Sequence, residues 1–220
     1  MSDALRLILF DVDGTLADSQ GAITSAMAAA FAGAGLPSPS RAEILSIVGL
    51  SLPLAMAELA GEQPADVQAV LVEGYKSAYK SARLAAGAGH SPLYPGAAEV
   101  LAELNAVPEY LLGVATGKSQ RGLDALIEAH ELRCFVTRQC ADHHPSKPHP
   151  SMVLRAMAET GVRPEDTVMI GDTSFDIDMG RAAGVRTIAV DWGFHPAERL
   201  GADHIIKSFD ELAPLLRNTW

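Results

Sequence analysis

Two acidic residues at the end of an apolar run are the first residues of the sequence that suggest chemistry. Asp11 and Asp13 directly follow this run in the stretch "LRLILFDVDGT". Two carboxylates about 4 Å apart repel by roughly 4 kcal/mol at an effective dielectric constant near 20. Residues two apart on an extended segment point the same way, so cations are needed to hold these acids together.

Three further stretches place polar residues where apolar runs end. "ATGKS" carries Thr116 and Lys118, "HPSKPHP" carries Lys147 before a predicted helix, and "IGDTSFDID" carries Asp172 and Asp176. If the preceding strands are parallel neighbours, all of these residues converge on one edge of a sheet. The sequence therefore predicts a single site built from four loops.

The acidic members of this set indicate a metal. The acidic motifs supply carboxylate oxygens and contain neither cysteine nor histidine. Such donors suit a hard cation. Mg²⁺ is the natural choice, because it keeps several waters and is commonly completed by a substrate phosphate.

The remaining members are hydrogen-bond donors suited to a phosphoryl group. The Thr116 hydroxyl, the backbone N–H groups around Gly117 and the Lys147 ammonium can all donate to phosphate oxygens. A carboxylate facing the phosphorus can act as a nucleophile and form an aspartyl-phosphate. Water then hydrolyses that intermediate with help from a nearby acid–base group.

Alternating strands and helices must position these residues. Short apolar runs are followed by turns and then by segments with helical spacing of apolar residues. This alternation predicts an α/β protein with a Rossmann-like parallel sheet sandwiched by helices. The predicted strands are 5–10, 110–117, 134–140, 167–172, 186–190 and 203–208, and the predicted helices between them are 96–106, 119–132, 150–161 and 174–184.

The interval 19–87 breaks this alternation. It contains no convincing strand and is too long for a connection within a compact domain. We predict that 19–87 is an inserted α-helical cap domain, and that 1–18 and 88–220 form the α/β core domain. The expected cap helices are 21–35, 40–48, 53–60 and 64–86.

Composition narrows the classes of partner. The chain has 220 residues, 48% of them hydrophobic, and a formal net charge of −10. This charge argues against a broad basic surface for nucleic acid. No apolar run reaches the roughly 20 residues that span a bilayer, and no signal peptide is apparent. We expect a cytoplasmic monomer or homodimer with no membrane partner, in which Cys134 and Cys140 are reduced thiols.

The four motifs, in this order, resemble the signature motifs of the haloacid dehalogenase superfamily of phosphohydrolases. The helical insertion resembles the C1-type cap of phosphoglycolate phosphatase-like members, and "VDWGFH" at 190–195 resembles a segment common there. The resemblance covers nearly the whole chain. Dehalogenases of this superfamily usually lack the second acid of the first motif, so Asp13 favours phosphate chemistry.

The resemblance implies a role for each motif residue. Asp11 would be the nucleophile and Asp13 the general acid and base. Thr116 and Gly117 would bind the phosphoryl group, and Lys147 would neutralise both the nucleophile and the phosphate.

The resemblance also implies the ligands of Mg²⁺. Asp172 would bind the metal together with Asp11 and the main-chain carbonyl of Asp13. Asp176 would hold the metal directly or through water.

Two positions depart from the pattern of the family. Gly117 stands where asparagine is common, and Ser146 stands before the motif lysine where glycine is commoner. Neither change removes a charged catalytic group. We therefore still expect activity, with one side-chain contact fewer in the pocket because Gly117 replaces an asparagine.

These observations predict a Mg²⁺-dependent phosphatase for a small phosphorylated metabolite, with phosphoglycolate as the first guess from the resemblance. A sugar-phosphate mutase of the β-phosphoglucomutase kind and an inorganic pyrophosphatase are the alternatives on the same scaffold. A non-catalytic module that binds a phosphorylated metabolite is a more remote alternative.

Several residues keep two interpretations. The loop "CADHHPSKPHP" has the residue types of a zinc site, or it is a solvent-facing loop that delivers Lys147. The stretch 48–56 either reaches over the site or is a turn between helices. Asp18 and Ser19 either cap the first cap helix or line the entrance. Packing or contacts at the rim of the site are expected for Asp178, Arg181, Trp192 and His195.

Overall fold

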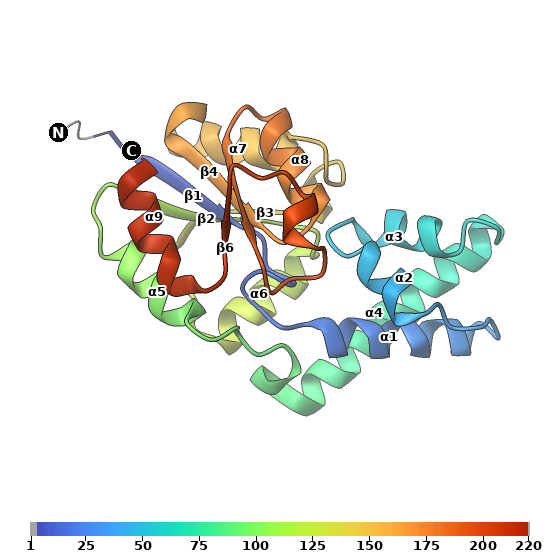
Figure 1. Cartoon of the computed structure of the whole chain (residues 1–220). Coiled ribbons are helices and arrows are strands. Elements are labelled where there is room, and N and C mark those ends of the chain that lie inside the picture. The colour runs from blue at the N-terminus through green and yellow to red at the C-terminus, as the bar shows by residue number, and fades with distance from the viewer. Residues whose placement is uncertain (1–3, 220) are drawn as a thin grey trace.

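A six-stranded parallel sheet forms the centre of the molecule (Figure 1). The computed structural model describes residues 4–219, and its strands are arranged in the order β3-β2-β1-β4-β5-β6. This arrangement confirms the predicted α/β fold with a parallel sheet. The strands are β1 (Arg6–Phe10), β2 (Tyr110–Thr116), β3 (Phe135–Cys140), β4 (Thr167–Gly171), β5 (Arg186–Val190) and β6 (His204–Ile206).

The central strand β1 is apolar throughout because helices cover both faces of the sheet. Ile8 and Phe10 pack with helices α5 (Ala97–Asn105), α6 (Gln120–Ala129) and α9 (Leu212–Thr219) on one face. Leu7 and Leu9 pack with α7 (Ser151–Thr160) and α8 (Ser174–Ala182) on the other. Helix α9 was not among the predicted helices. The short 3₁₀ helices are Gly87–His90, Ala141–His143, Pro164–Asp166, Ala197–Arg199 and Phe209–Glu211.

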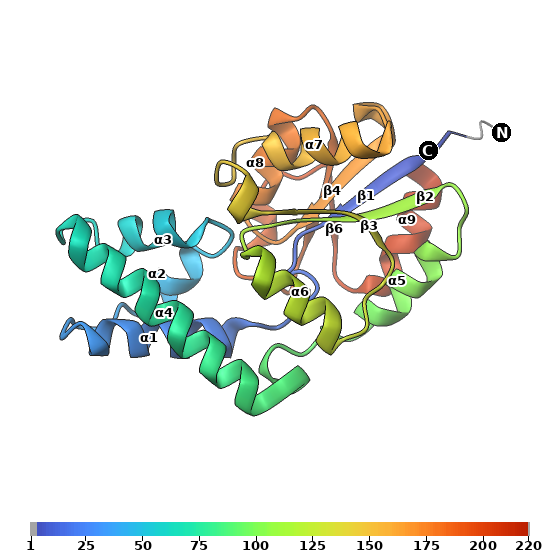
Figure 2. The ribbon, with the colours of Figure 1, turned by 180° about the vertical axis from the view of Figure 1, so that it is seen from behind.

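Four helices follow the first motif and lie to one side of the sheet (Figures 1 and 2). They are α1 (Gln20–Gly33), α2 (Arg41–Ser46), α3 (Leu52–Leu59) and α4 (Ala65–Ala86), and they match the expected cap helices. Their buried side chains, among them Met27, Met56 and Leu71, form a hydrophobic cluster of their own. The division into a core domain and a cap domain at 18/19 and 87/88 stays a prediction.

The two segments that join the four helices to the sheet run side by side. Ala17 and Leu93 form an antiparallel bridge. The Asp18 N–H donates to the carbonyl of Pro92 at 2.8 Å, and the Tyr94 N–H donates to the carbonyl of Leu16 at 2.9 Å. The helical insertion therefore leaves and re-enters the core at one place.

Within residues 4–219, no helix has the length and apolar character needed to cross a bilayer.

Candidate active site

Asp11 lies at the carboxyl end of the central strand and pairs with a buried lysine. Its N–H donates to the carbonyl of Ile170, which continues the pairing of β1 with β4. The Lys147 ammonium lies 2.6 Å from Asp11 Oδ1 and also 2.6 Å from Asp176 Oδ1. All three side chains are buried. Lys147 therefore bridges two of the predicted site acids.

Asp172 follows β4 and is held by two donors. The Thr15 hydroxyl donates to Oδ1 at 2.9 Å, and the Phe194 N–H donates to Oδ2 at 2.9 Å. The surrounding backbone is close to this side chain. A Cβ atom on Gly14 would lie 2.2 Å from Asp172 Oδ2, and a Cβ atom on Gly193 would lie 2.0 Å from the Cβ of Asp172. Glycine is required at both positions to leave space for this carboxylate.

Asp176 lies in the first turn of α8 and takes part in a capping box. Its Oδ2 accepts from the Thr173 N–H at 3.0 Å and from the Thr173 hydroxyl at 2.7 Å. Its other oxygen accepts from Lys147. The start of the helix thus fixes the rotamer of this acid and directs Oδ1 toward the site.

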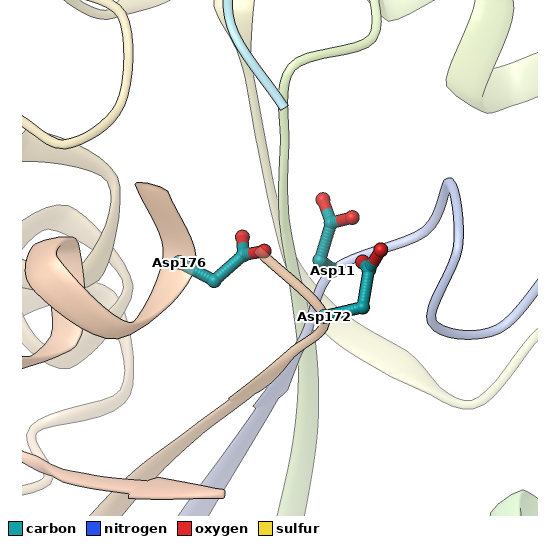
Figure 3. Close-up of side chains that lie close together, drawn as sticks. All are labelled: Asp11, Asp172 and Asp176. Atoms are coloured by element: carbon teal, nitrogen blue, oxygen red, sulfur yellow. The ribbon is translucent and has the colours of Figure 1, made fainter. Parts of the chain in front are cut away.

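The carboxylates of Asp11, Asp172 and Asp176 converge, as Figure 3 shows. One oxygen from each lies within 4.8 Å of the others, and all three residues are buried. Within residues 4–219, this is the one group of three or more side chains with the spacing of a metal site. The prediction that Asp11 and Asp172 lie together is confirmed.

The buried acids carry more negative charge than Lys147 can balance. Burial raises the pKa of Asp11 to about 7, and the Asp176 and Asp13 carboxylates add to this rise, while Lys147 opposes it. Burial also raises the pKa of Asp172 well above its usual range, and its two acidic neighbours contribute. The donor set therefore fits a cation: its oxygens are hard, clustered and short of positive charge.

Asp13 lies apart from this cluster and pairs with a different lysine. Lys118 Nζ donates to Asp13 Oδ1 at 2.7 Å and to the Tyr79 hydroxyl at 3.1 Å. Tyr79 belongs to α4, so the contact joins Asp13 to the helical insertion. Because the Asp13 carboxylate is not in the acidic cluster, only the predicted main-chain contact with a metal remains open for this residue.

Lys118 and Tyr79 received no role from the sequence. The lysine is one residue beyond the "ATG" of the second motif. Burial lowers the pKa of its ammonium, but Asp13 together with the Tyr79 and Tyr75 hydroxyls outweighs this effect and raises the pKa of Lys118. The position of Lys118 within the second motif, directly after "ATG", could have identified it as a site residue from the sequence. No local signal marks Tyr79, because it enters the site from a helix far away in the sequence.

The predicted phosphoryl-binding residues lie beside this pair. Thr116 is buried at the end of β2, and its hydroxyl accepts from the Lys118 N–H at 3.2 Å. Gly117 follows it and lines the same cavity as Asp11 and Asp13. Lys147 reaches Asp11 from the loop before α7. The four loops therefore meet at one edge of the sheet, as expected.

A cavity of about 320 Å³ opens from Asp11 and Asp13 toward the helical insertion. One part of its wall is apolar and comes from α1 and the segment around α3. Another part is basic and comes from α4, α6 and the loop that precedes α6. The apolar lining includes Ile23, Met27, Val48, Leu50 and Leu52, and the basic lining includes Lys76, Lys80, Arg83, Lys118 and Arg121. The stretch 48–56 thus reaches the site, and it also forms the start of α3.

The residues suggested for zinc are engaged elsewhere. The Cys140 thiol donates to Gln120 Oε1, and His144 contacts Gln139 Oε1 and the Ser151 hydroxyl. None of them belongs to the acidic cluster. The loop interpretation, in which this segment delivers Lys147, is the one that the geometry favours.

The other open positions, apart from the Ser19 hydroxyl, make structural contacts. Asp18 Oδ1 accepts from the Gln20 N–H at 3.4 Å, whereas Ser19 is the N-cap residue of α1 but its hydroxyl makes no capping bond. Trp192 Nε1 donates to the carbonyl of Thr15 at 3.1 Å. Asp178 lies 3.7 Å from Arg181.

His195 connects the core to the helical insertion. Its Nδ1 accepts from the Ser174 N–H at 3.2 Å, so Nε2 carries the proton and donates to the carbonyl of Ser46 at 3.2 Å.

Comparison with known proteins agrees with this geometry. The family model described as haloacid dehalogenase-like hydrolase matches residues 8–190. The chain belongs to this family. The resemblance given by the four motifs is thereby confirmed, and the chain is a haloacid dehalogenase-like hydrolase.

Relatives of this hydrolase carry phosphatase names. "Probable phosphatase IndB" of Dickeya dadantii is 34% identical over 213 residues, which cover 94% of this chain and 91% of the relative. A phosphoglycolate phosphatase of Chromobacterium violaceum is 33% identical over 218 residues, with 97% of each chain covered. An N-acetylmuramic acid 6-phosphate phosphatase of Pseudomonas aeruginosa is 33% identical over 224 residues, covering 96% and 95%.

Solved structures share the whole fold of this chain. A haloacid dehalogenase-like hydrolase from Streptococcus pneumoniae superposes with a TM-score of 0.83 at 26% identity, covering 98% of this chain and 99% of the other. CbbY from Rhodobacter sphaeroides, solved in complex with phosphate, has a TM-score of 0.80 at 26% identity, covering 94% and 96%.

Proposed function

We propose that this phosphatase depends on Mg²⁺ and hydrolyses the phosphomonoester of a small metabolite through a phosphorylated Asp11. The observation that carries this proposal is the convergence of Asp11, Asp172 and Asp176 within 4.8 Å, with Lys147 at 2.6 Å from Asp11. A buried aspartate that lines a cavity, belongs to a cation site and contacts a lysine is placed to attack an electrophilic phosphorus atom.

The proposed reaction has two displacements. Asp11 attacks the phosphorus, the bond from phosphorus to the ester oxygen breaks, and Asp13 gives a proton to the departing alcohol. Asp13 then takes a proton from water, whose oxygen attacks the phosphorus of phospho-Asp11. Inorganic phosphate leaves and Asp11 is restored as a carboxylate. The Thr116 hydroxyl and the Lys147 ammonium hold the phosphoryl oxygens.

In this proposal Asp11, Asp172 and Asp176 hold the metal, with the main-chain carbonyl of Asp13. The bound ion supplies positive charge next to the nucleophile and the phosphoryl oxygens. The hard oxygen donors, and the raised pKa values of Asp11 and Asp172, support a divalent cation of this kind. Lys147 keeps two of these carboxylates in place.

A phosphoglycolate-type ester is the substrate class that we propose. The cavity of about 320 Å³ suits a small leaving group. Similar phosphatases are named for phosphoglycolate and for N-acetylmuramic acid 6-phosphate. We further propose that segment 19–87 acts as the cap domain that encloses this substrate, in a cytoplasmic enzyme that needs no nucleic acid or membrane partner.

The test is release of inorganic phosphate from a panel of small phosphate esters, with Mg²⁺ and with a chelator in its place. We expect Mg²⁺-dependent turnover by the unchanged protein and none by Asp11→Asn, with Ser38→Ala as an active control. Unaltered turnover by Asp11→Asn would reject the proposed nucleophile.

The same panel separates the alternatives. Isomer formation without free phosphate marks a mutase, and release from pyrophosphate alone marks a pyrophosphatase. Saturable binding without turnover marks a non-catalytic module.

A further inference from the structure

The two positions that depart from the family's motif pattern both lie against the same loop of the helical insertion. Gly117 and Ser146 belong to different core loops, far apart in the sequence. Both meet the segment 49–51 between α2 and α3. This loop lines the cavity, and the two core positions are neighbours of Thr116 and Lys147, the predicted phosphoryl-binding residues.

At Gly117 the contact is a close steric approach of the two main chains. A Cβ atom there would lie 2.5 Å from the carbonyl oxygen of Gly49 and 2.8 Å from that of Leu50. Backbone oxygens at such distances cannot move aside as a flexible side chain can. A larger residue at 117 is therefore incompatible with the observed position of the loop.

At Ser146 the contact is a hydrogen bond. The Ser51 N–H donates to the Ser146 hydroxyl at 2.8 Å across 95 positions of sequence. A glycine at position 146 would leave this N–H without its partner. Both substitutions relative to the common motif therefore favour the same placement of one loop.

Few other polar contacts join the insertion to the core away from the two linkers. Among the described residues they include His195 with the Ser46 carbonyl and Lys118 with the Tyr79 hydroxyl. Gly49 itself has φ +107°, and a Cβ on it would lie 3.1 Å from the Thr173 hydroxyl. The loop thus approaches three core segments through its main chain.

We propose that Gly117 and Ser146 form a seat for the loop 49–51, which fixes the closed position of the helical insertion over the reaction centre. Ser146 and Gly117 are positioning residues. Each neighbours a phosphoryl-binding residue, Lys147 or Thr116, and each contacts the main chain of the loop, so the placement of the loop is coupled to the placement of these two residues. The seat deepens the proposed function, because closure excludes water from the phosphoryl group and limits the size of the leaving group.

The first test measures the loop itself, without any substrate. Hydrogen exchange of the Ser51 N–H, followed by NMR or by mass spectrometry of a peptide covering 49–52, reports the seat directly. Ser146→Ala is expected to speed this exchange by about threefold to tenfold, the range for loss of one hydrogen bond. Ser38→Ala is the matched control, because its hydroxyl contacts only the neighbouring carbonyl of Pro39.

The second test adds a methyl group to the seat. Gly117→Ala is expected to displace the loop, to speed exchange throughout 49–51, and to lower kcat/KM at least tenfold while Mg²⁺ affinity stays unchanged. Gly21→Ala is the control, because a Cβ there meets nothing within 4 Å. Circular dichroism and thermal unfolding establish that each variant is folded.

The outcomes distinguish the seat from the proposed function. Unchanged exchange at Ser51 in both seat variants would overturn the seat, whatever the activity. If the unchanged protein hydrolyses a phosphate ester, equal kcat/KM values for this protein and for both seat variants would also overturn the role of the seat in closure. If the unchanged protein hydrolyses no ester but Ser146→Ala still speeds exchange at Ser51, the proposed function fails and the seat stands.

Discussion

At the scale of single residues, Lys147 holds the reaction centre together. Within residues 4–219, its ammonium is the one cation that contacts both Asp11 and Asp176, and all three side chains are buried. Removing one partner of a buried ionic group leaves an uncompensated charge, which costs more than the pair contributes. Stability and activity should therefore both depend on this ammonium.

Lys147→Met is expected to destabilise the metal-free protein by about 3 kcal/mol and to abolish phosphate release. Urea unfolding measures the first effect and a phosphate assay the second. Lys207→Met, at an exposed lysine outside the site, serves as control. Equal unfolding midpoints for the two variants would contradict the role of Lys147.

The pH dependence of metal binding follows from Asp11. Its pKa rises from 3.8 in the unfolded chain to about 7 in the metal-free fold. This group thus contributes stability that is fully present below pH 3.8 and is lost as the pH rises through about 7. Mg²⁺ competes with these protons. We expect the rise in melting temperature on adding Mg²⁺ to be larger at pH 8 than at pH 5.5; a larger rise at the lower pH would count against a carboxylate site.

At the scale of elements, the N-terminus of α8 combines a cap with a metal ligand. Thr173 is the N-cap residue of the helix, and its N–H and hydroxyl donate to Asp176 Oδ2 while Asp176 Oδ1 accepts from Lys147. One local motif therefore decides where the helix begins and how the acid is oriented. The cost of disturbing the cap should appear in the affinity for metal.

Thr173→Ala is expected to weaken Mg²⁺ binding by about tenfold, as loss of an orienting hydrogen bond usually does, and to lower stability by about 1 kcal/mol. Thr173→Ser keeps the hydroxyl and should retain both the Mg²⁺ affinity and the stability of the unchanged protein. Titration calorimetry and urea unfolding make the comparison. Identical Mg²⁺ affinities for the alanine and serine variants would show that the cap does not orient Asp176.

The sequence predicted the elements well and their long-range contacts poorly. All six strands and the four helices of the insertion were expected, because apolar runs and helical periodicity are local signals. The convergence of Asp11 with Asp172 followed from parallel strands. Helix α9 was missed, since it is short and contains Pro214 near its start.

Two contacts had no counterpart in any local pattern. The pairing of Lys118 with Tyr79 joins residues 39 positions apart, and the bond from Ser51 to Ser146 spans 95. Neither depends on periodicity or turn chemistry. Both are set by how the insertion packs on the core, which a single sequence does not encode locally.

At the scale of the whole molecule, the lining of the cavity has a net positive charge although the chain as a whole is negatively charged. The chain has a net charge of −10, yet the cavity lining holds five basic side chains and three acidic ones. The acids Asp11 and Asp13 already have lysine partners. Within residues 4–219, Lys80, Arg83 and Arg121 have no carboxylate within ion-pair distance. A substrate with a second negative group would compensate this basic wall.

Arg83→Met is expected to raise KM roughly tenfold or more for a two-carbon phosphate ester that ends in a carboxylate, and to leave ethyl phosphate unaffected. Steady-state kinetics with both esters make the test. Arg133→Met is the control, since Arg133 is exposed and lies outside the cavity lining. Equal changes for both esters would mean that Arg83 does not recognise the second charge.

The bridge between Ala17 and Leu93 has a consequence for how such enzymes diversify. Seen from the sheet, everything between these residues is a loop, and the entropy of closing a loop grows only slowly with its length. An insertion of another size or shape can occupy this junction without shifting the register of β1 or moving Asp11. New substrate preferences can thus be acquired at the junction while the chemistry at the sheet edge is inherited intact.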